Sequence, residues 1–152
     1  MTSKGIFYFA YGSNLNQRQM RERCPESSLV GRAHIKGYRL DFTISSPVRW
    51  HGGGCADIVA DAGSVVWGLM YKLSDRDLER LDQSEGSRYR RFVISTVSDD
   101  GGITDAYVYE VIDKAPFQQP AKAYLDIIKN AARDVNFPEA YRAFLDAIPT
   151  QD

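Results

Sequence analysis

Glu85 is a carboxylate that its expected helix would turn toward the protein interior. Leu78 and Leu81 stand seven and four residues before it, so the three side chains share one helix face. A carboxylate on such a face is costly unless it is paired or used. Two other interpretations stay open: the helix frays before Glu85, or Arg88 or Arg90 pairs with it. The spacing makes Glu85 a candidate for proton transfer.

The segment Tyr11-Gly12-Ser13-Asn14-Leu15 is a candidate anion-binding turn. It joins a short apolar run, Ile6–Ala10, which favours a buried strand, to a helix that Ser13 or Asn14 would cap. Gly12 can take a positive φ or let a ligand approach the backbone. The next N–H groups are the unpaired donors of a helix start, which bind a carboxylate, phosphate or oxyanion. The alternative is an ordinary strand-to-helix turn.

Serine-nucleophile and zinc chemistry receive little support from the sequence. Ser13 lacks the G-x-S-x-G context, and nothing places His34 or His51 near it as a base. Cys24, Cys55 and the two histidines show no metal-ligand spacing. We therefore expect no metal site.

The bulk composition indicates one globular domain over residues 1–152. Hydrophobic residues make up 43% of the 152 residues, and the net charge is −1. The chain can thus build one core, and no overall field favours nucleic acid or an anionic membrane. The N-terminus lacks the features of a signal peptide, and no apolar run approaches the roughly 18 residues of a membrane span. We expect a cytoplasmic protein with no nucleic-acid or membrane partner.

The elements that would position these residues form an alternating set of strands and helices. Ser74 and Asp77 have capping-box spacing for a helix to about Ser84, with Gly86 just past its end. Pro120 and Pro138 open two amphipathic helices. Strands are predicted over residues 6–10, 29–45 with breaks at Gly31 and Gly37, 55–60, 65–73, 89–98 and 103–112, the last two as a hairpin. The sum predicts an α+β fold: a mixed, mostly antiparallel β-barrel with flanking helices.

Five segments in order resemble the γ-glutamylcyclotransferase (AIG2-like) family, and together they run through nearly the whole chain. The motif Y-G-S-N-L at 11–15 is moderately specific, and E-G at 85–86 is weak alone. The segments are Phe7-Tyr8-Phe9-Ala10 with the turn, Tyr38-Arg39-Leu40-Asp41-Phe42, Trp50-His51-Gly52-Gly53 with Cys55-Ala56-Asp57-Ile58, Val66-Trp67-Gly68-Leu69-Met70-Tyr71, and Leu81-Asp82-Gln83-Ser84-Glu85-Gly86.

The resemblance implies a γ-glutamyl cyclotransferase-like fold and a reaction that needs no cofactor. In it, the α-amine of a γ-glutamyl group attacks its own γ-carbonyl, giving 5-oxoproline and a free amino acid, as in glutathione metabolism. Glu85 would be the general base, with its pKa raised by burial. Tyr11, Gly12, Ser13, Asn14, Leu15 and Tyr107 would contact the small-molecule γ-glutamyl substrate. Either Tyr89 or Phe92 would hold the family's tyrosine position, and a homodimer is left open.

Two rival functions differ from this interpretation. A sibling enzyme would cyclise γ-glutamyl amines or a γ-glutamyl-protected metabolite, keeping both features and changing the leaving-group pocket. A non-catalytic small-ligand binding module on the same fold would keep the turn without needing the base. The carboxylate of Glu85 before Gly86 argues against the second.

Overall fold

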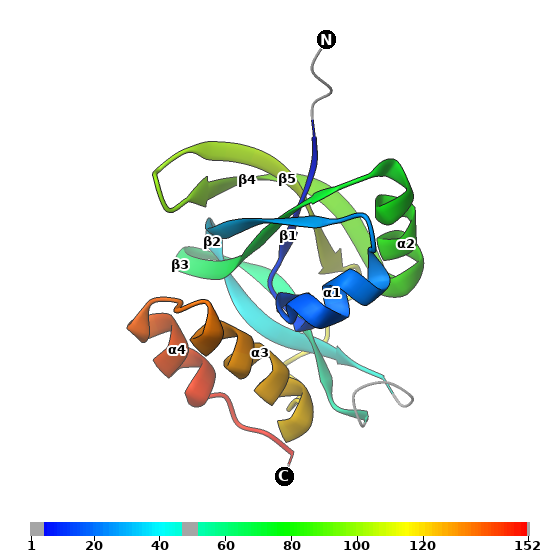
Figure 1. The fold of residues 1–152 in the computed structure, drawn as a ribbon. Helices are drawn as coiled ribbons and strands as arrows, with labels where there is room; N and C mark the ends of the chain where they lie inside the picture. Colours follow the sequence, from blue (N-terminus) through cyan, green and yellow to red (C-terminus); the bar gives the residue numbers. More distant parts are fainter. Residues whose placement is uncertain (1–4, 47–51, 152) are drawn as a thin grey trace.

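The described residues form a closed β-barrel with helices outside it (Figure 1). The computed structural model describes residues 5–46 and 52–151. The barrel order is β1-β3-β2-β4-β5, and its paired strands are antiparallel except for the parallel closure of β1 on β5. This confirms the predicted fold class. The strands are β1 (Ile6–Ala10), β2 (Ser28–Ser45), β3 (Gly54–Leu73), β4 (Tyr89–Ser98) and β5 (Ile103–Val111).

β2 and β3 are long, bent strands. Gly31 and Gly37, at φ of 153° and 82°, lie at register shifts between the two strands. They act as bulges, which bend a strand without ending it. The prediction of two separate strands over 55–60 and 65–73 was wrong, because β3 continues through Gly63, whose φ is 87°. This bending lets the two strands wrap around the barrel.

Most helices begin and end close to the capping residues, prolines and glycines that predicted them. Ser74 caps α2 by accepting a hydrogen bond from the Asp77 N–H at 3.1 Å, and Gly86 follows the helix with a φ of 82°. The predicted cap of the first helix was wrong, since Asn16 accepts from the Gln19 N–H at 2.9 Å. The helices are the 3-10 helix η1 (Ser13–Leu15), α1 (Gln17–Arg23), α2 (Asp75–Glu85), α3 (Lys122–Asp134) and α4 (Glu139–Asp146).

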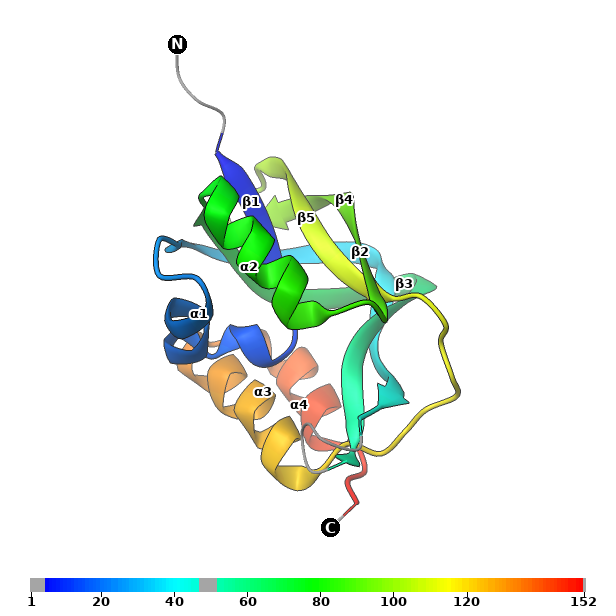
Figure 2. The same ribbon diagram turned by 90° about the vertical axis from the view of Figure 1, so that its right-hand side faces the viewer.

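The helices cover two sides of the barrel and bury apolar residues against it. In Figures 1 and 2, α2 lies on one side of the barrel, above α1, whereas α3 and α4 lie side by side at the other end of the barrel. Leu81 of α2 and Leu125 and Ile128 of α3 are fully buried. Within residues 5–46 and 52–151, no helix is long and apolar enough to cross a membrane.

Asp77 is a charged residue that is buried, although most aspartates in proteins are exposed. Its side chain is fully buried and pairs with Arg80 across one helical turn, with 2.7 Å between Arg80 Nη1 and Asp77 Oδ1. Asp77 therefore belongs to the packing between α2 and Cys24, whose thiol donates to the Asp77 carbonyl oxygen at 3.6 Å.

Candidate functional site

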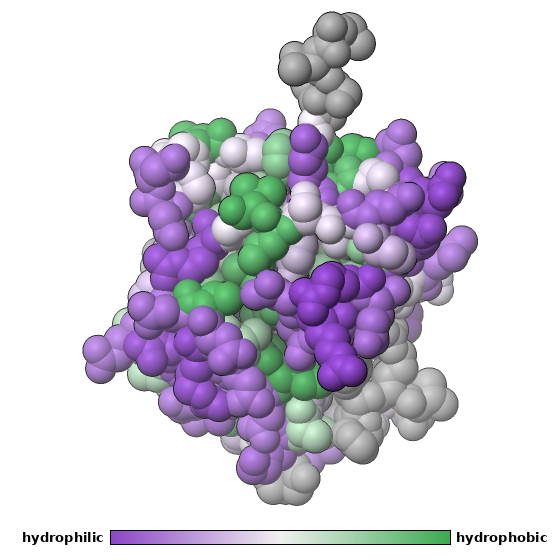
Figure 3. Space-filling view, in the orientation of Figure 1, coloured by the Kyte–Doolittle hydropathy of each residue, from purple (hydrophilic) through white to green (hydrophobic). Residues whose placement is uncertain are grey.

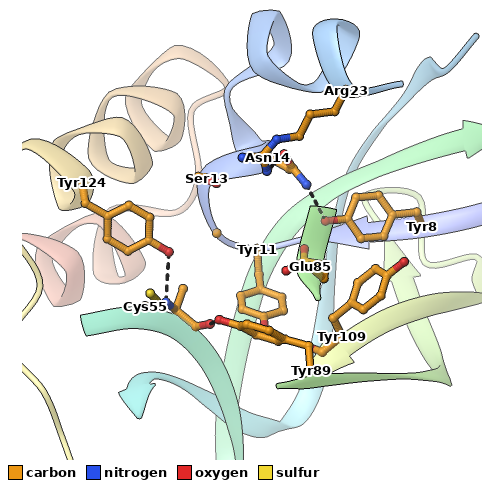
Figure 4. A pocket seen from close by; sticks show the side chains of 12 residues that line it. Tyr8, Tyr11, Ser13, Asn14, Arg23, Cys55, Glu85, Tyr89, Tyr109 and Tyr124 are labelled. Atoms are coloured by element: carbon orange, nitrogen blue, oxygen red, sulfur yellow. Dashed lines mark hydrogen bonds between the residues drawn. The ribbon is translucent and has the colours of Figure 1, made fainter. Parts of the chain in front are cut away.

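Glu85 and the turn after β1 line one cavity, although some seventy positions separate them in the sequence (Figure 4). Five tyrosines from four different elements or their flanks complete most of its wall. The cavity is lined by Tyr8, Tyr11, Gly12, Ser13, Asn14, Arg23, Cys55, Ala56, Glu85, Tyr89, Tyr109 and Tyr124. The structure thus brings together the two features whose chemistry the sequence suggested.

Glu85 is the last residue of α2 and is half-buried. Its carboxylate lies among the rings of Tyr8, Tyr11 and Tyr109 in Figure 4. Burial, and to a smaller extent the negative charge of Glu85, raises the pKa of each of these phenols and of Tyr89 above the usual value. At neutral pH the four hydroxyls are therefore protonated, and each can donate a hydrogen bond.

The two arginines considered as partners of Glu85 have contacts on the barrel. Arg88 donates from Nη1 to the Ser45 carbonyl oxygen at 3.0 Å. Arg90 pairs with the carboxylate of Glu110 on the neighbouring strand. Both side chains are exposed.

The turn is a single 3-10 turn with Gly12 before it. The Leu15 N–H donates to the Gly12 carbonyl oxygen at 3.0 Å, so the first N–H groups without an acceptor inside the helix are those of Ser13 and Asn14. Leu15 itself is 1% exposed and packs into the core, outside the cavity lining. Of the predicted contact residues in the turn, the four from Tyr11 to Asn14 remain at the cavity.

Gly12 allows the turn to pack closely against the opposite wall of the cavity. A Cβ at this position would lie 3.2 Å from the Ala56 Cβ and 3.8 Å from the Tyr124 hydroxyl. A larger side chain would therefore push on the β3 wall and fill part of the cavity.

Asn14 is a buried hub that holds the turn to α1 and β1. Its Oδ1 accepts from Arg23 Nη1 at 2.9 Å and from Gln19 Nε2 at 3.0 Å. These two donors fix the orientation of the amide, so Nδ2 faces the Tyr8 hydroxyl and donates to it at 3.0 Å. Since the Tyr8 oxygen accepts this bond, its own proton is available for another acceptor.

Two tyrosines hold the opposite wall of the cavity at Ala56. The Ala56 N–H donates to the Tyr124 hydroxyl at 2.9 Å, and the Tyr89 hydroxyl donates to the Ala56 carbonyl oxygen at 2.8 Å. Both bonds cross between distant elements, from α3 and β4 to β3. They fix the backbone that faces Gly12 and Glu85.

Asp57, the next residue along β3, anchors this wall from the other face of the strand. Its fully buried carboxylate accepts from the Thr43 hydroxyl at 2.7 Å, the Val111 N–H at 2.9 Å and Lys114 Nζ at 2.8 Å. A buried charge that is paired and bonded in this way is stable at its position. The network ties β2, β3 and β5 together directly behind Ala56.

The structure places Tyr109, and not Tyr107, at the cavity. The Tyr107 ring is half-buried and lies under the Arg91 guanidinium, 4.7 Å from its carbon, and it is not among the lining residues. Tyr109 stands two residues further on the same strand face, and its hydroxyl donates to Asp82 Oδ1 at 2.7 Å. Period-two spacing puts both rings on one face but does not say which is nearer the site.

Of Tyr89 and Phe92, only Tyr89 is at the cavity. Tyr89 lines the cavity, whereas Phe92 is half-buried against the core with the Arg90 guanidinium 4.9 Å from its ring centre.

Some residues that line the cavity were not expected there: Tyr8, Arg23, Cys55, Ala56 and Tyr124. For Arg23 a signal was present, since Gln19 and Arg23 are four residues apart and share the helix face toward Asn14.

The cysteines and histidines contribute no metal site among the described residues. Cys24 and Cys55 are both buried and form no disulfide, and of the two only Cys55 lines the cavity. Burial raises the pKa of Cys24 to about 12. His34 packs on Trp67, with 4.7 Å between ring centres, away from the cavity. His51 and Trp50, in the expected glycine turn, lie outside the described residues.

We expect Gly12→Val to impair both substrate binding and turnover. The branched side chain would crowd Ala56 and the Tyr124 hydroxyl, because even a Cβ at residue 12 comes within 3.2 Å of the first. Steady-state kinetics measures the effect, and we expect kcat/KM to fall at least tenfold. Gly63→Val is the control for backbone strain alone. Gly63 lies far along β3, and a Cβ added there would meet no other atom within 4 Å. Kinetics of Gly12→Val equal to wild type would show that the turn is merely structural.

Comparisons with known proteins place the chain in one family. The family model described as Gamma-glutamyl cyclotransferase, AIG2-like matches residues 8–129. The human protein named Gamma-glutamylcyclotransferase is 31% identical over 98% of this chain and 81% of its own length. A solved structure named Gamma-glutamyl cyclotransferase superposes with a TM-score of 0.91 at 28% identity, covering 98% of this chain and 90% of the other.

A fourth comparison extends the fold to a bacterial protein. The crystal structure of YkqA from Bacillus subtilis matches with a TM-score of 0.74 at 24% identity, over 97% of this chain and 56% of YkqA. At that identity the likeness concerns the fold alone. The family model covers most of the chain, and the human relative and the solved structure match it almost end to end. The chain therefore belongs to the gamma-glutamyl cyclotransferase, AIG2-like family of enzymes.

Proposed function

We propose that this protein is a γ-glutamylcyclotransferase that converts γ-glutamyl amino acids and dipeptides to 5-oxoproline and releases the free amino acid. The observation that carries the proposal is the shared cavity of Glu85 and the Tyr11–Asn14 turn. One feature moves protons, and the other binds negative charge. A ring closure inside one substrate molecule requires proton transfer and stabilisation of negative charge, and it requires no cofactor.

The proposed reaction forms one carbon–nitrogen bond and breaks another. The α-nitrogen attacks the γ-carbonyl carbon, giving a tetrahedral intermediate with a negative oxygen. Collapse of this intermediate breaks the bond to the leaving nitrogen. Two protons pass overall from the attacking ammonium to the departing amine. Holding the flexible glutamyl chain in attack geometry is worth roughly 7–11 kcal/mol in favourable intramolecular models.

Glu85 is the group that we propose to move these protons. The substrate ammonium must lose a proton before it can attack, and a positioned carboxylate removes it and returns it to the leaving nitrogen. The half-buried carboxylate lies near the Tyr8 hydroxyl, which stays protonated and keeps its proton for another acceptor, so this phenol orients the carboxylate or the substrate without competing for the proton. We assign Tyr109, in place of Tyr107, to substrate contact, because Tyr109 lines the cavity and Tyr107 does not.

The N–H groups of Ser13 and Asn14 are the donors that we propose for the developing oxyanion. They stand at the start of η1, where the helix itself offers them no acceptor. Preorganised donors of this kind act where charge appears in the transition state, and each is worth about 100-fold or more in rate. The Asn14 hub and the Ala56 wall hold these donors rigidly.

Release of 5-oxoproline from a panel of γ-glutamyl compounds tests the proposal. The panel contains γ-glutamyl amino acids, a γ-glutamyl amine and glutathione, and the product is measured by chromatography. Release from the amino-acid compounds at the highest kcat/KM is the expected result. Preference for the amine would favour the sibling enzyme. Saturable binding without release from any compound would support the non-catalytic module and reject the cyclotransferase.

A further inference from the structure

We propose that Arg23 binds the α-carboxylate of the γ-glutamyl group and so selects substrates that carry it. This inference rests on the proposed function and adds a specificity-determining residue to it. The turn and Glu85 then keep their own separate tasks, which are the oxyanion and the proton.

Arg23 is placed to meet a substrate. It ends α1, is half-buried, and lines the cavity next to Asn14 (Figure 4). Figure 3 shows a strongly hydrophilic surface over α1, where the other arginines of this helix, Arg18 and Arg21, are exposed. Among the residues that line the cavity, Arg23 is the one cation and Glu85 the one anion.

Most N–H donors of Arg23 have no acceptor among the residues that the structure describes. Its one hydrogen bond there, from Nη1 to the Asn14 amide oxygen, uses one of five N–H donors. No carboxylate of residues 5–46 and 52–151 lies within ion-pair distance of it, whereas Arg32 and Arg80 each pair with an aspartate. A half-buried guanidinium without a carboxylate partner is matched to a ligand that brings one.

The two charges of the cavity match the head of a γ-glutamyl group. That head carries an ammonium and a carboxylate on the same carbon. Burial is the main cause of the raised pKa of the Tyr8 phenol; of the two charges near it, Glu85 raises that pKa further and Arg23 lowers it. In Figure 4, Arg23 and Asn14 lie on one side of the Tyr8 hydroxyl and Glu85 lies on the other. With the ammonium at Glu85, the neighbouring carboxylate falls on the Arg23 side.

The hydrogen bond to Asn14 does not by itself explain Arg23. Gln19 Nε2 donates to the same amide oxygen at 3.0 Å and also to the Ser13 hydroxyl at 2.8 Å. The orientation of Asn14, and with it the turn, thus keeps one donor when Arg23 is removed. A variant without the guanidinium should lose the charge in the cavity and retain the cavity wall.

The test compares Arg23→Met with wild type on two substrates that differ only in the α-carboxylate. γ-Glutamyl-alanine cyclises to 5-oxoproline, and 4-aminobutanoyl-alanine cyclises to 2-pyrrolidinone; each releases alanine, which is the product measured. We expect wild type to prefer the first. In the variant, kcat/KM for γ-glutamyl-alanine should fall roughly 10- to 100-fold, the worth of a charged hydrogen bond. The value for 4-aminobutanoyl-alanine should stay within about twofold.

The same comparison is made on binding, by titrating 5-oxoproline and 2-pyrrolidinone in a calorimeter. Wild type should bind the carboxylate-bearing product more tightly, and Arg23→Met should bind the two alike. Arg21→Met is the matched control, because Arg21 is exposed on the same helix and does not line the cavity. It should behave as wild type in both measurements.

Three outcomes would overturn the inference. An equal loss on both substrates would mean that Arg23 acts only through Asn14. A loss confined to γ-glutamyl-alanine when it is compared with γ-glutamyl-ethylamide would assign Arg23 to the leaving amino acid. Equal affinity of wild type for the two products would remove the carboxylate subsite. Failure of the proposed function looks different, since wild type would then release no alanine from either substrate.

Discussion

Glu85→Gln is expected to abolish nearly all turnover while leaving the fold and substrate binding intact. Glutamine keeps the shape of the side chain and its hydrogen-bonding oxygen but cannot accept a proton near neutral pH. A positioned general acid–base group contributes typically about 100- to 10,000-fold. We therefore expect kcat for 5-oxoproline release to fall by that factor, with KM changed little.

Glu79→Gln is the matched control for this variant. It changes the same residue type on the same helix, at an exposed position that does not line the cavity. Its kcat should equal that of wild type, and both variants should have wild-type circular dichroism and thermal midpoints. Release of 5-oxoproline by Glu85→Gln near the wild-type rate would end the assignment of Glu85 as the base.

Much of the fold could be predicted from local signals, because those signals act over a few residues. Alternation and turn chemistry predicted β4, the hairpin and β5, and the spacing of Ser74, Asp77 and Gly86 predicted α2. The closure of β1 on β5 could not be predicted, since it joins segments about a hundred positions apart. Gly31 and Gly37 were ambiguous for a similar reason: a glycine marks a bulge or a strand end, and only the partner strand decides.

The site was less predictable than the fold. The stripe of Leu78, Leu81 and Glu85 predicted an inward carboxylate, and the structure places it at a cavity. Its meeting with the turn came from the resemblance, because spacing carries no information across seventy positions. Asp77 is a second case that residue type alone does not predict. Aspartates are mostly exposed in proteins, but this one is fully buried and paired with Arg80.

The buried tyrosines predict a second large effect, which is a loss of folding stability at alkaline pH. Burial raises the pKa of Tyr8, Tyr11 and Tyr141 well above the usual value in the folded state. In the unfolded chain each phenol ionises near its ordinary pKa of about 10. Because the folded value is raised, this stabilisation is fully present below pH 10 and is lost as pH rises toward the folded pKa.

The magnitude follows from the ionisation of the unfolded chain alone. At pH 11 each phenol that stays protonated in the fold costs about 1.4 kcal/mol of the free energy of unfolding. Tyr8, Tyr11 and Tyr141 together remove about 4 kcal/mol, a large part of a typical stability of roughly 5–15 kcal/mol. Urea unfolding at pH 8 and pH 11, followed by circular dichroism, measures the loss.

Tyr141→Phe separates the phenols from the other groups that titrate in alkali. Other groups, such as the Cys24 thiol, also lose protons in alkali, but they are the same in both proteins, so their contribution cancels in the difference. Tyr141 packs against Phe137 on the α4 side, away from the cavity, and its loss should not affect catalysis. The variant should lose about 1.4 kcal/mol less than wild type between pH 8 and pH 11. An identical loss in the two proteins would mean that the Tyr141 phenol ionises equally easily in both states, and that its burial does not hold the proton.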